Sequence, residues 1–419
     1  MPADTLLARA GELLAENTRE AVFNGRVYRF SIPAQERYRF QWFWDSCFHA
    51  IVWARLDVER ACDELRGLLA LQAPSGRIPH VVFWDETLVS RTGWHYLESP
   101  GRLGWFLPGS QPRATAMIQP PVIAQAVEAI VERGGEAFLD EALPALERYY
   151  RYLARERDPD RDGLISIIAQ FESGIDFSPA YDPKWGATAP AILGLAARVP
   201  EIVDKLVDWN LELVFRFNPR HVEDVLVNSV YADALQALAR LAARRGNPEL
   251  ETWAATAARR VRDALLERCY DERCGLFFNL NGSKERRADG VKTIISLLPL
   301  LLADLPSDVA ARLVEHLADP REFWAPFPVA SVALDEPTFR RDSRVDGSRR
   351  IWRGPCSLNT NWLLSLGLRR HGENVLADDL ATRSRELVER GGFNEFFDPL
   401  DGTPVGAHRF GWATLAAVI

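Results

Sequence analysis

The chain has 419 residues, of which 47% are hydrophobic and 26% are charged, a composition typical of a soluble globular protein with a large core. A formal net charge of −8, with no run of basic residues, argues against a nucleic-acid-binding surface, because such a surface must neutralise phosphates. We therefore expect no nucleic-acid partner.

Three features bear on where the protein works. Residues 1–17 have the spacing of an amphipathic helix and lack the basic head and continuous apolar stretch of a signal peptide. The longest apolar run, residues 293–305, is too short to span a bilayer and contains Pro299. Five cysteines form no paired CxxC spacing, which predicts reduced thiols. We expect a cytoplasmic protein with no membrane partner.

Helical periodicity dominates the rest of the chain. Apolar residues recur at three- and four-residue spacing in 123–135, 143–156, 229–247, 251–271 and 373–392. Asp- and Gly-containing loops recur between apolar segments, at 157–166, 270–278 and 397–406. Helical hairpins that close on such loops predict an all-α toroid or solenoid. No linker interrupts the pattern, so we expect one domain over 1–419.

One long segment stands outside the helices. Residues 84–112 are rich in Trp, Gly and Pro and are too long for a simple connector. We expect this segment to form a lid or a wall of a site.

Four clusters combine acids, amides and aromatic residues, at 38–49, 77–85, 170–178 and 391–399. Each cluster alone is equally consistent with a helix end whose acid caps the backbone. Together they favour a sugar-cleaving site. Glycoside hydrolysis needs one carboxyl held protonated in an apolar environment and a second that stays ionised. Aromatic faces would bind the apolar side of the sugar ring.

The motifs FQWFWDSCFH, ESGIDFSP, WRGPCSLNTNWLLSLGLRRHG and GFNEFFDPLDG resemble signatures of glycoside hydrolase family 63 and its trehalase-like relatives. The resemblance covers about residues 23–416. It implies an (α/α)6 barrel, a six-hairpin toroid, with long loops forming a lid over the pocket. Within that group, the compact length and the run QERYRFQWFWDSCFHAI are most similar to bacterial enzymes that hydrolyse mannosylglycerate and glucosylglycerate.

The resemblance also implies roles for individual residues. Asp176 matches the family's general acid, with Glu172 as a supporting carboxylate, and Glu395 matches the general base of these inverting enzymes. Asp45 matches a ligand of the sugar hydroxyls. The other positions expected to bind substrate are Tyr38, Gln41, Trp42, Trp44, His80, Gln119, Gly174 and Trp352.

The resulting hypothesis is an inverting α-glycosidase that hydrolyses 2-O-α-D-mannosyl-D-glycerate, and glucosylglycerate as a further substrate. The aglycone carboxylate would need cationic or neutral donors, and Arg91, Arg216, Arg353 and Arg409 are the arginine candidates. Two alternatives stay open: a barrel enzyme of the trehalase or mannosyl-oligosaccharide glucosidase type acting on a neutral substrate, and a helical repeat scaffold without turnover. A homo-oligomer is also left open.

No cofactor is expected, because the sequence contains no P-loop, GxGxxG fingerprint or HExxH pair. Residues 158–163, DPDRDG, match the start of a calcium loop. Ala169, however, occupies the twelfth position, where such a loop carries a bidentate Glu. We expect no metal in the site, and the sequence leaves the occupancy of this loop open.

Overall fold

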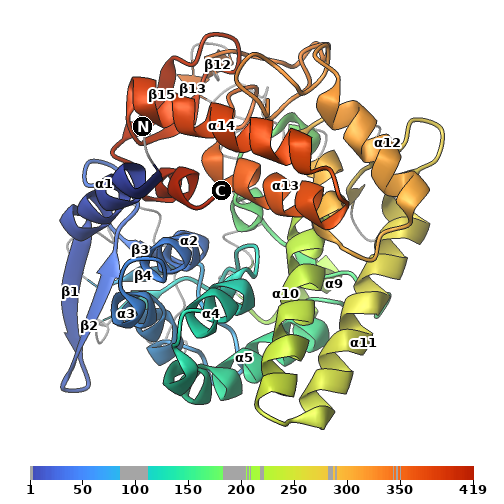
Figure 1. Ribbon diagram of the computed structural model, residues 1–419. Coiled ribbons are helices and arrows are strands. Elements are labelled where there is room, and N and C mark those ends of the chain that lie inside the picture. Colours follow the sequence, from blue (N-terminus) through green and yellow to red (C-terminus); the bar gives the residue numbers. More distant parts are fainter. Residues whose placement is uncertain are drawn as a thin grey trace.

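The computed structural model describes residues 3–84, 112–182, 204, 207, 209–217, 221–281, 286–287, 290–342, 344–345, 348–349 and 351–419. Helices form a ring in which the N-terminal and C-terminal segments lie close together (Figure 1). The lid expected over 84–112 falls almost wholly on 85–111, outside the described residues.

Six helical segments form the inner wall of the ring. In chain order they are α2 (Phe43–Trp53), α4 (Ile123–Val131), α10 (Val225–Arg244), the 3₁₀ helix η6 (Ile294–Leu301), α13 (Leu358–Arg370) and the 3₁₀ helix η7 (Gly411–Ala417). Each packs against the next, and η7 packs against α2 to close the ring. Every residue of α2 is buried, as expected for a helix covered all round.

A second layer of helices covers the first. It consists of α1 (Ala3–Glu16), α3 (Val58–Ala70), α5 (Glu136–Glu156), α11 (Pro248–Ala264), α12 (Ser307–Ala318) and α14 (Asn374–Gly391). These pack on η7, α2, α4, α10, η6 and α13 respectively. The six pairs make the (α/α)6 architecture that was expected.

The five periodic stretches are helical, with shifted ends that local chemistry explains. The helix expected from residue 229 begins at Val225, because the side chain of Asp224 accepts a hydrogen bond from the backbone N–H of Val227. The apolar run at 293–305 forms η6, a 3₁₀ segment that contains Pro299, a residue with no backbone N–H to donate. Among the described residues, no helix combines the length and apolarity needed to cross a membrane.

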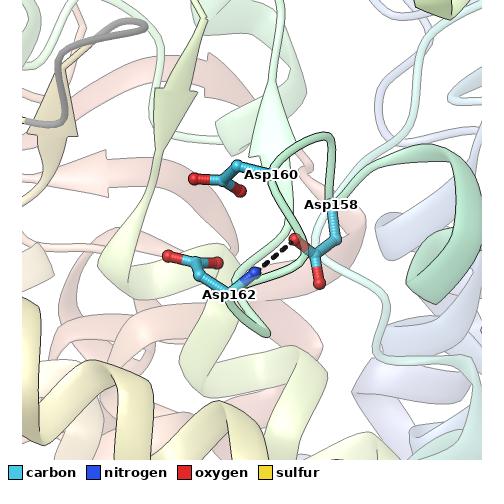
Figure 2. A group of neighbouring side chains, drawn as sticks. All are labelled: Asp158, Asp160 and Asp162. Atoms are coloured by element: carbon cyan, nitrogen blue, oxygen red, sulfur yellow. Dashed lines mark hydrogen bonds between the residues drawn. The ribbon is translucent and has the colours of Figure 1, made fainter.

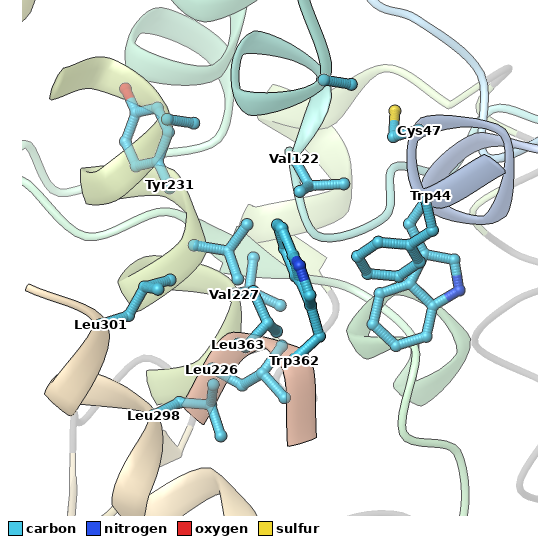
Figure 3. Packing of buried hydrophobic residues seen from close by; sticks show 14 of the residues in the cluster. Trp44, Cys47, Val122, Leu226, Val227, Tyr231, Leu298, Leu301, Trp362 and Leu363 are labelled. Atoms are coloured by element: carbon cyan, nitrogen blue, oxygen red, sulfur yellow. The ribbon is translucent and has the colours of Figure 1, made fainter. Parts of the chain in front are cut away.

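The centre of the ring is filled by apolar side chains from successive inner segments. Figure 3 shows Trp44 of α2, Val227 of α10, Leu298 of η6 and Trp362 of α13 in one packed group. Trp362 also meets Phe48 of α2 edge to face, with ring centroids 5.9 Å apart. One continuous core therefore joins hairpins that are far apart in sequence.

Strands are short and occur between the helices. Two small sheets are β3-β4-β5 (Gln41–Trp42, Val81–Phe83, Arg113–Ala114) and β11-β10-β7-β6 (Arg286–Arg287, Leu280–Asn281, Val222–Glu223, Ser166–Ile167). The two-stranded pairs are β1–β2 (Thr18–Phe23, Arg26–Ser31), β8–β9 (Tyr270–Asp271, Leu276–Phe277), β12–β13 (Arg344–Val345, Ser348–Arg349) and β14–β15 (Asn394–Phe397, Pro404–His408). Two of the expected Asp-Gly loops are thus turns of antiparallel hairpins, β8–β9 and β14–β15.

Shorter elements complete the described chain. They are the 3₁₀ helices η3 (Gln170–Ser173) and η4 (Pro179–Tyr181), the helix α9 (Leu211–Phe217), and a π-helical turn η5 (Leu265–Cys269) that continues α11. The segment between η3 and η4 carries Asp176, and β14 carries Glu395.

Candidate active site

One pocket gathers side chains from all four clusters that the sequence analysis singled out. It encloses about 400 Å³ of empty space, part of which is open to solvent. The lining residues are Pro33, Tyr38, Trp42, Trp44, Asp45, His80, Gln119, Phe171, Gly174, Asp176, Ile351, Trp352, Glu395, Phe410 and Trp412. Both carboxyl groups expected to be catalytic face this one cavity.

Asp176 lies in the turn between η3 and η4. The preceding Gly174 has a φ of 73°, and a Cβ atom built there would lie 2.5 Å from the ring of Trp44. Only glycine fits this close approach at low cost. Burial, and to a lesser extent the charge on Glu395, raises the pKa of Asp176 to about 8. At neutral pH Asp176 therefore carries a proton that it can donate.

Glu395 sits on β14 and is almost completely buried. The hydroxyl of Tyr38 donates to Oε1 at 2.8 Å, and the backbone N–H of Ala407 donates to Oε2 at 2.8 Å. The register between β14 and β15 shifts between Asn394 and Phe396, an irregularity that alters the direction of the intervening side chain. The two donors hold the carboxylate in one orientation.

Several buried polar atoms in the lining have no hydrogen-bond partner within the described part of the chain: Asp45 Oδ1, Trp42 Nε1 and both ring nitrogens of His80. Burial raises the pKa of Asp45 well above its usual range and lowers the pKa of His80 to about 3, so the imidazole is neutral. Buried polar groups normally have hydrogen-bond partners, and these three residues line a cavity. The hydroxyls of a sugar would supply them.

Gln119 also lines the pocket, and its Oε1 accepts a hydrogen bond from the backbone N–H of Trp44 at 3.0 Å. Gln41, expected beside it, is not among the lining residues. Its Nε2 donates to Glu64 O at 3.0 Å, and its Oε1 accepts from Trp84 Nε1 at 2.9 Å. Gln41 therefore serves the framework behind the pocket rather than the lining.

Glu172 lies behind the pocket and does not line it. It forms a fully buried, bidentate ion pair with Arg157, with nitrogen–oxygen distances of 2.9 and 2.8 Å. The same carboxylate accepts from the backbone N–H groups of Ile118 and Ile168. The pair thus joins η3 to the segment that carries Gln119.

The arginines proposed for a substrate carboxylate lie elsewhere. Arg353 is buried and binds both carboxylate oxygens of Asp182, and it also donates to Phe177 O. Arg409 pairs with Glu16, and the guanidinium of Arg216 lies over the Phe217 ring. Arg91 lies outside the described residues. Over the described part of the chain, the lining contains no arginine or lysine.

Two aromatic residues of the lining, Phe410 and Trp412, lie outside the four clusters and were not predicted from the sequence. Their rings are 4.4 Å apart at the centroids, and Trp412 Nε1 donates to the backbone carbonyl of Glu395 at 3.1 Å. They come from a short C-terminal segment without helical periodicity. The aromatic pair in RFGW was the one available signal.

A ring of helical hairpins around an aromatic pocket that contains two carboxyl groups fits a glycoside hydrolase. Comparison with known families agrees: residues 38–413 match the family described as the mannosylglycerate hydrolase MGH1-like glycoside hydrolase domain. The chain belongs to this family.

Individual relatives extend this result over nearly the whole chain. The chain is 31% identical to a mannosylglycerate hydrolase of Thermus thermophilus over 98% of its length and 99% of that enzyme. It is 30% identical to a glucosylglycerate hydrolase of Mycolicibacterium hassiacum, over 99% of this chain and 97% of that enzyme. A solved family 63 mannosylglycerate hydrolase of Thermus thermophilus, in complex with glucose, aligns over 98% of this chain and 99% of its own with a TM-score of 0.82 and 30% identity. Neutral trehalase of Saccharomyces cerevisiae, at 15% identity, a TM-score of 0.62 and coverage of 98% of this chain and 78% of its own, shares the fold alone.

Proposed function

We propose that this glycoside hydrolase cleaves 2-O-α-D-mannosyl-D-glycerate, and glucosylglycerate as a second substrate, with inversion at the anomeric carbon. Asp176 is the general acid and Glu395 the general base. The observation that carries the proposal is the pair of unlike carboxyl groups in one pocket: Asp176 with a pKa raised to about 8, and Glu395 held by two hydrogen-bond donors.

The chemistry follows from the two protonation states. Asp176 donates its proton to the glycosidic oxygen as the bond to the anomeric carbon breaks, and glycerate leaves with that proton. A water on the opposite face of the sugar loses a proton to Glu395 as its oxygen bonds to the anomeric carbon. After the reaction Asp176 is ionised and Glu395 is protonated. Proton exchange with solvent then restores the starting state of both carboxyl groups. Inverting enzymes hold the two carboxyls roughly 6.5–9.5 Å apart, which leaves room for the water.

The polar lining atoms that have no hydrogen-bond partner in the described structure would bind the hydroxyls of the sugar. Asp45 accepts from sugar hydroxyls, the neutral His80 ring can donate and accept, and Trp42 donates through Nε1.

The assignment of glycerate rests on the relatives. A mannosylglycerate hydrolase and a glucosylglycerate hydrolase resemble this chain at 31% and 30% identity over 98% and 99% of its length, and one solved relative was crystallised with Tris and D-glycerate. The described lining contains no arginine or lysine to bind the glycerate carboxylate, which makes substrate choice the point to test.

Purified protein is incubated with mannosylglycerate, glucosylglycerate and trehalose, and free sugar is measured. We expect both glycosyl-glycerates to be hydrolysed and trehalose to be a poor substrate. Asp176→Asn and Glu395→Gln should each abolish turnover while the protein stays folded. Asp308→Asn, a matched change on the exposed face of α12, should leave turnover intact. Equal turnover of trehalose would refute the anionic substrate, and full activity of either active-site variant would refute the assigned roles.

A further inference from the structure

The backbone around Asp176 contains two residues in the left-handed conformation, Gly174 with a φ of 73° and Phe177 with a φ of 62°. Glycine adopts this conformation readily, but a bulky residue rarely does, because its Cβ atom crowds the backbone. Phe177 directly follows the acid, so its backbone angles help to set the direction of the chain at Asp176. Such a conformation persists only where neighbouring groups hold it.

Side chains bind both polar backbone groups of Phe177. The backbone N–H of Phe177 donates to Oε1 of Gln170 at 2.9 Å, a contact that spans seven residues. The carbonyl of Phe177 accepts from Arg353 Nη1 at 3.0 Å. The ring of Phe177 also meets Phe171 of the pocket lining edge to face, with centroids 6.0 Å apart. The left-handed residue is therefore held at its amide, its carbonyl and its ring.

The residue before the acid is held through the same glutamine. The backbone N–H of Ile175 donates to Ser173 Oγ at 3.1 Å, and that hydroxyl donates to the backbone carbonyl of Gln170 at 2.6 Å. The N–H groups on both sides of Asp176 are thus connected to Gln170, one through its side chain and one through its carbonyl.

Gln170 acts from a fixed base. It is the first residue of η3, and Glu172 of the same turn forms the buried ion pair with Arg157 at the end of α5. The chain after Arg157 closes into a tight turn, in which the backbone N–H of Asp162 donates to Asp158 at 3.0 Å (Figure 2). Strain at Phe177 is therefore opposed by a well-anchored segment.

We infer that Gln170 is a positioning residue, which aims the carboxyl group of Asp176 at the glycosidic oxygen by holding Phe177 in its left-handed conformation. The inference rests on the proposed function, in which Asp176 is the general acid. Gln170 is absent from the lining of the described pocket, so its effect on the reaction would pass through Asp176. A displacement of about 1 Å at a reacting group can lower the rate about a hundredfold.

A substrate that needs no general acid separates this role from a general loss of structure. In α-mannosyl fluoride the water attacks the anomeric carbon and gives its proton to Glu395, while fluoride leaves as an anion without a proton from the enzyme. Gln170→Met removes the acceptor and keeps a side chain of similar length. We expect kcat/KM for mannosylglycerate to fall at least about tenfold and kcat/KM for the fluoride to stay within about twofold of the wild type.

Three further variants complete the test. Gln170→Glu keeps an oxygen acceptor at the same reach and should retain most of the activity on mannosylglycerate. Gln236→Met is a matched control, because Gln236 is a partly exposed glutamine of α10 outside the pocket lining, and it should leave both reactions unchanged. Asp176→Asn should lose mannosylglycerate hydrolysis and keep hydrolysis of the fluoride.

The outcomes distinguish the inference from the proposed function. Equal losses on both substrates in Gln170→Met, or no loss on either, would overturn the positioning role. A Gln170→Glu variant as impaired as Gln170→Met would overturn it too, since the acceptor would not then be the reason. Wild-type hydrolysis of mannosylglycerate by Asp176→Asn would instead refute the acid assigned in the proposed function.

Discussion

The two carboxyl groups of the pocket differ in what surrounds them rather than in kind. Asp176 is near apolar rings and Glu395, whereas Glu395 accepts hydrogen bonds from Tyr38 and from Ala407 N. An environment that favours the neutral form of one acid and fixes the other as an acceptor is what general acid–base hydrolysis requires.

Tyr38→Phe removes one of the two hydrogen bonds to Glu395 and leaves the aromatic ring. A hydrogen bond to a charged group is worth about 1.5–3 kcal/mol, so we expect kcat to fall about ten- to a hundredfold. The fold should be retained, because the Tyr38 ring still meets Phe410 edge to face. Steady-state kinetics and circular dichroism check this, with Tyr270→Phe as a distant control. An unchanged kcat would show that Tyr38 does not support Glu395.

The raised pKa of Asp176 predicts two pH effects. Activity should fall as pH rises through about 8, because the general acid loses its proton. For stability, the folded state keeps this proton up to about pH 8 while the unfolded chain loses it near pH 4. Between these values the folded state binds more protons, so a rise in pH destabilises it. Thermal unfolding at several pH values should therefore show Asp176→Asn gaining stability relative to the wild type from pH 4 to pH 8. A constant difference would contradict the raised pKa.

At the scale of elements, the site depends on short segments placed between helices. The turn that holds Asp176 follows η3, and η3 is anchored by the pair Glu172–Arg157. After the acid, Arg353 binds Asp182 and the carbonyl of Phe177. A buried ion pair before the acid-bearing turn and a partly buried one after it thus fix that turn.

Breaking one of these ion pairs should lower the free energy of unfolding. Glu172→Gln leaves Arg157 buried with a weakened partner, and loss of one member of a buried pair typically costs about 3–5 kcal/mol. Adding Arg157→Met to Glu172→Gln should restore part of that loss, since no unpaired charge then remains and an amide oxygen at position 172 can still accept from the backbone N–H groups of Ile118 and Ile168. Urea unfolding of the two variants measures the effect. If the double variant is no more stable than Glu172→Gln, the cost does not arise from an uncompensated charge.

The helices could be predicted from sequence because their apolar spacing repeats over many residues. The strands could not, since most are two residues long and show no alternation. Because strand β3 was not predicted, Gln41 was wrongly expected to line the pocket. It is adjacent to Trp42 in β3, and successive strand residues point to opposite faces, so only one can face the pocket.

At the scale of the whole molecule, the site exists because the ring closes. The N-terminal helix α1 packs against the C-terminal η7, and Asn17 Nδ2 donates to Arg409 O at 3.1 Å. Closure brings Tyr38 to Glu395 across 357 positions of sequence. The motifs indicated which residues belong to the site, but long-range contacts such as the hydrogen bond from Trp412 to the backbone of Glu395 required the three-dimensional fold.

In the proposed mechanism, Asp176 and Glu395 act on opposite faces of one sugar in a single displacement. Proton NMR during hydrolysis of α-mannosylglycerate tests this most directly, because it identifies the anomer released before mutarotation. We predict that β-mannose appears first. Initial release of α-mannose would contradict inversion and would require a double displacement, with carboxyl groups only about 5 Å apart.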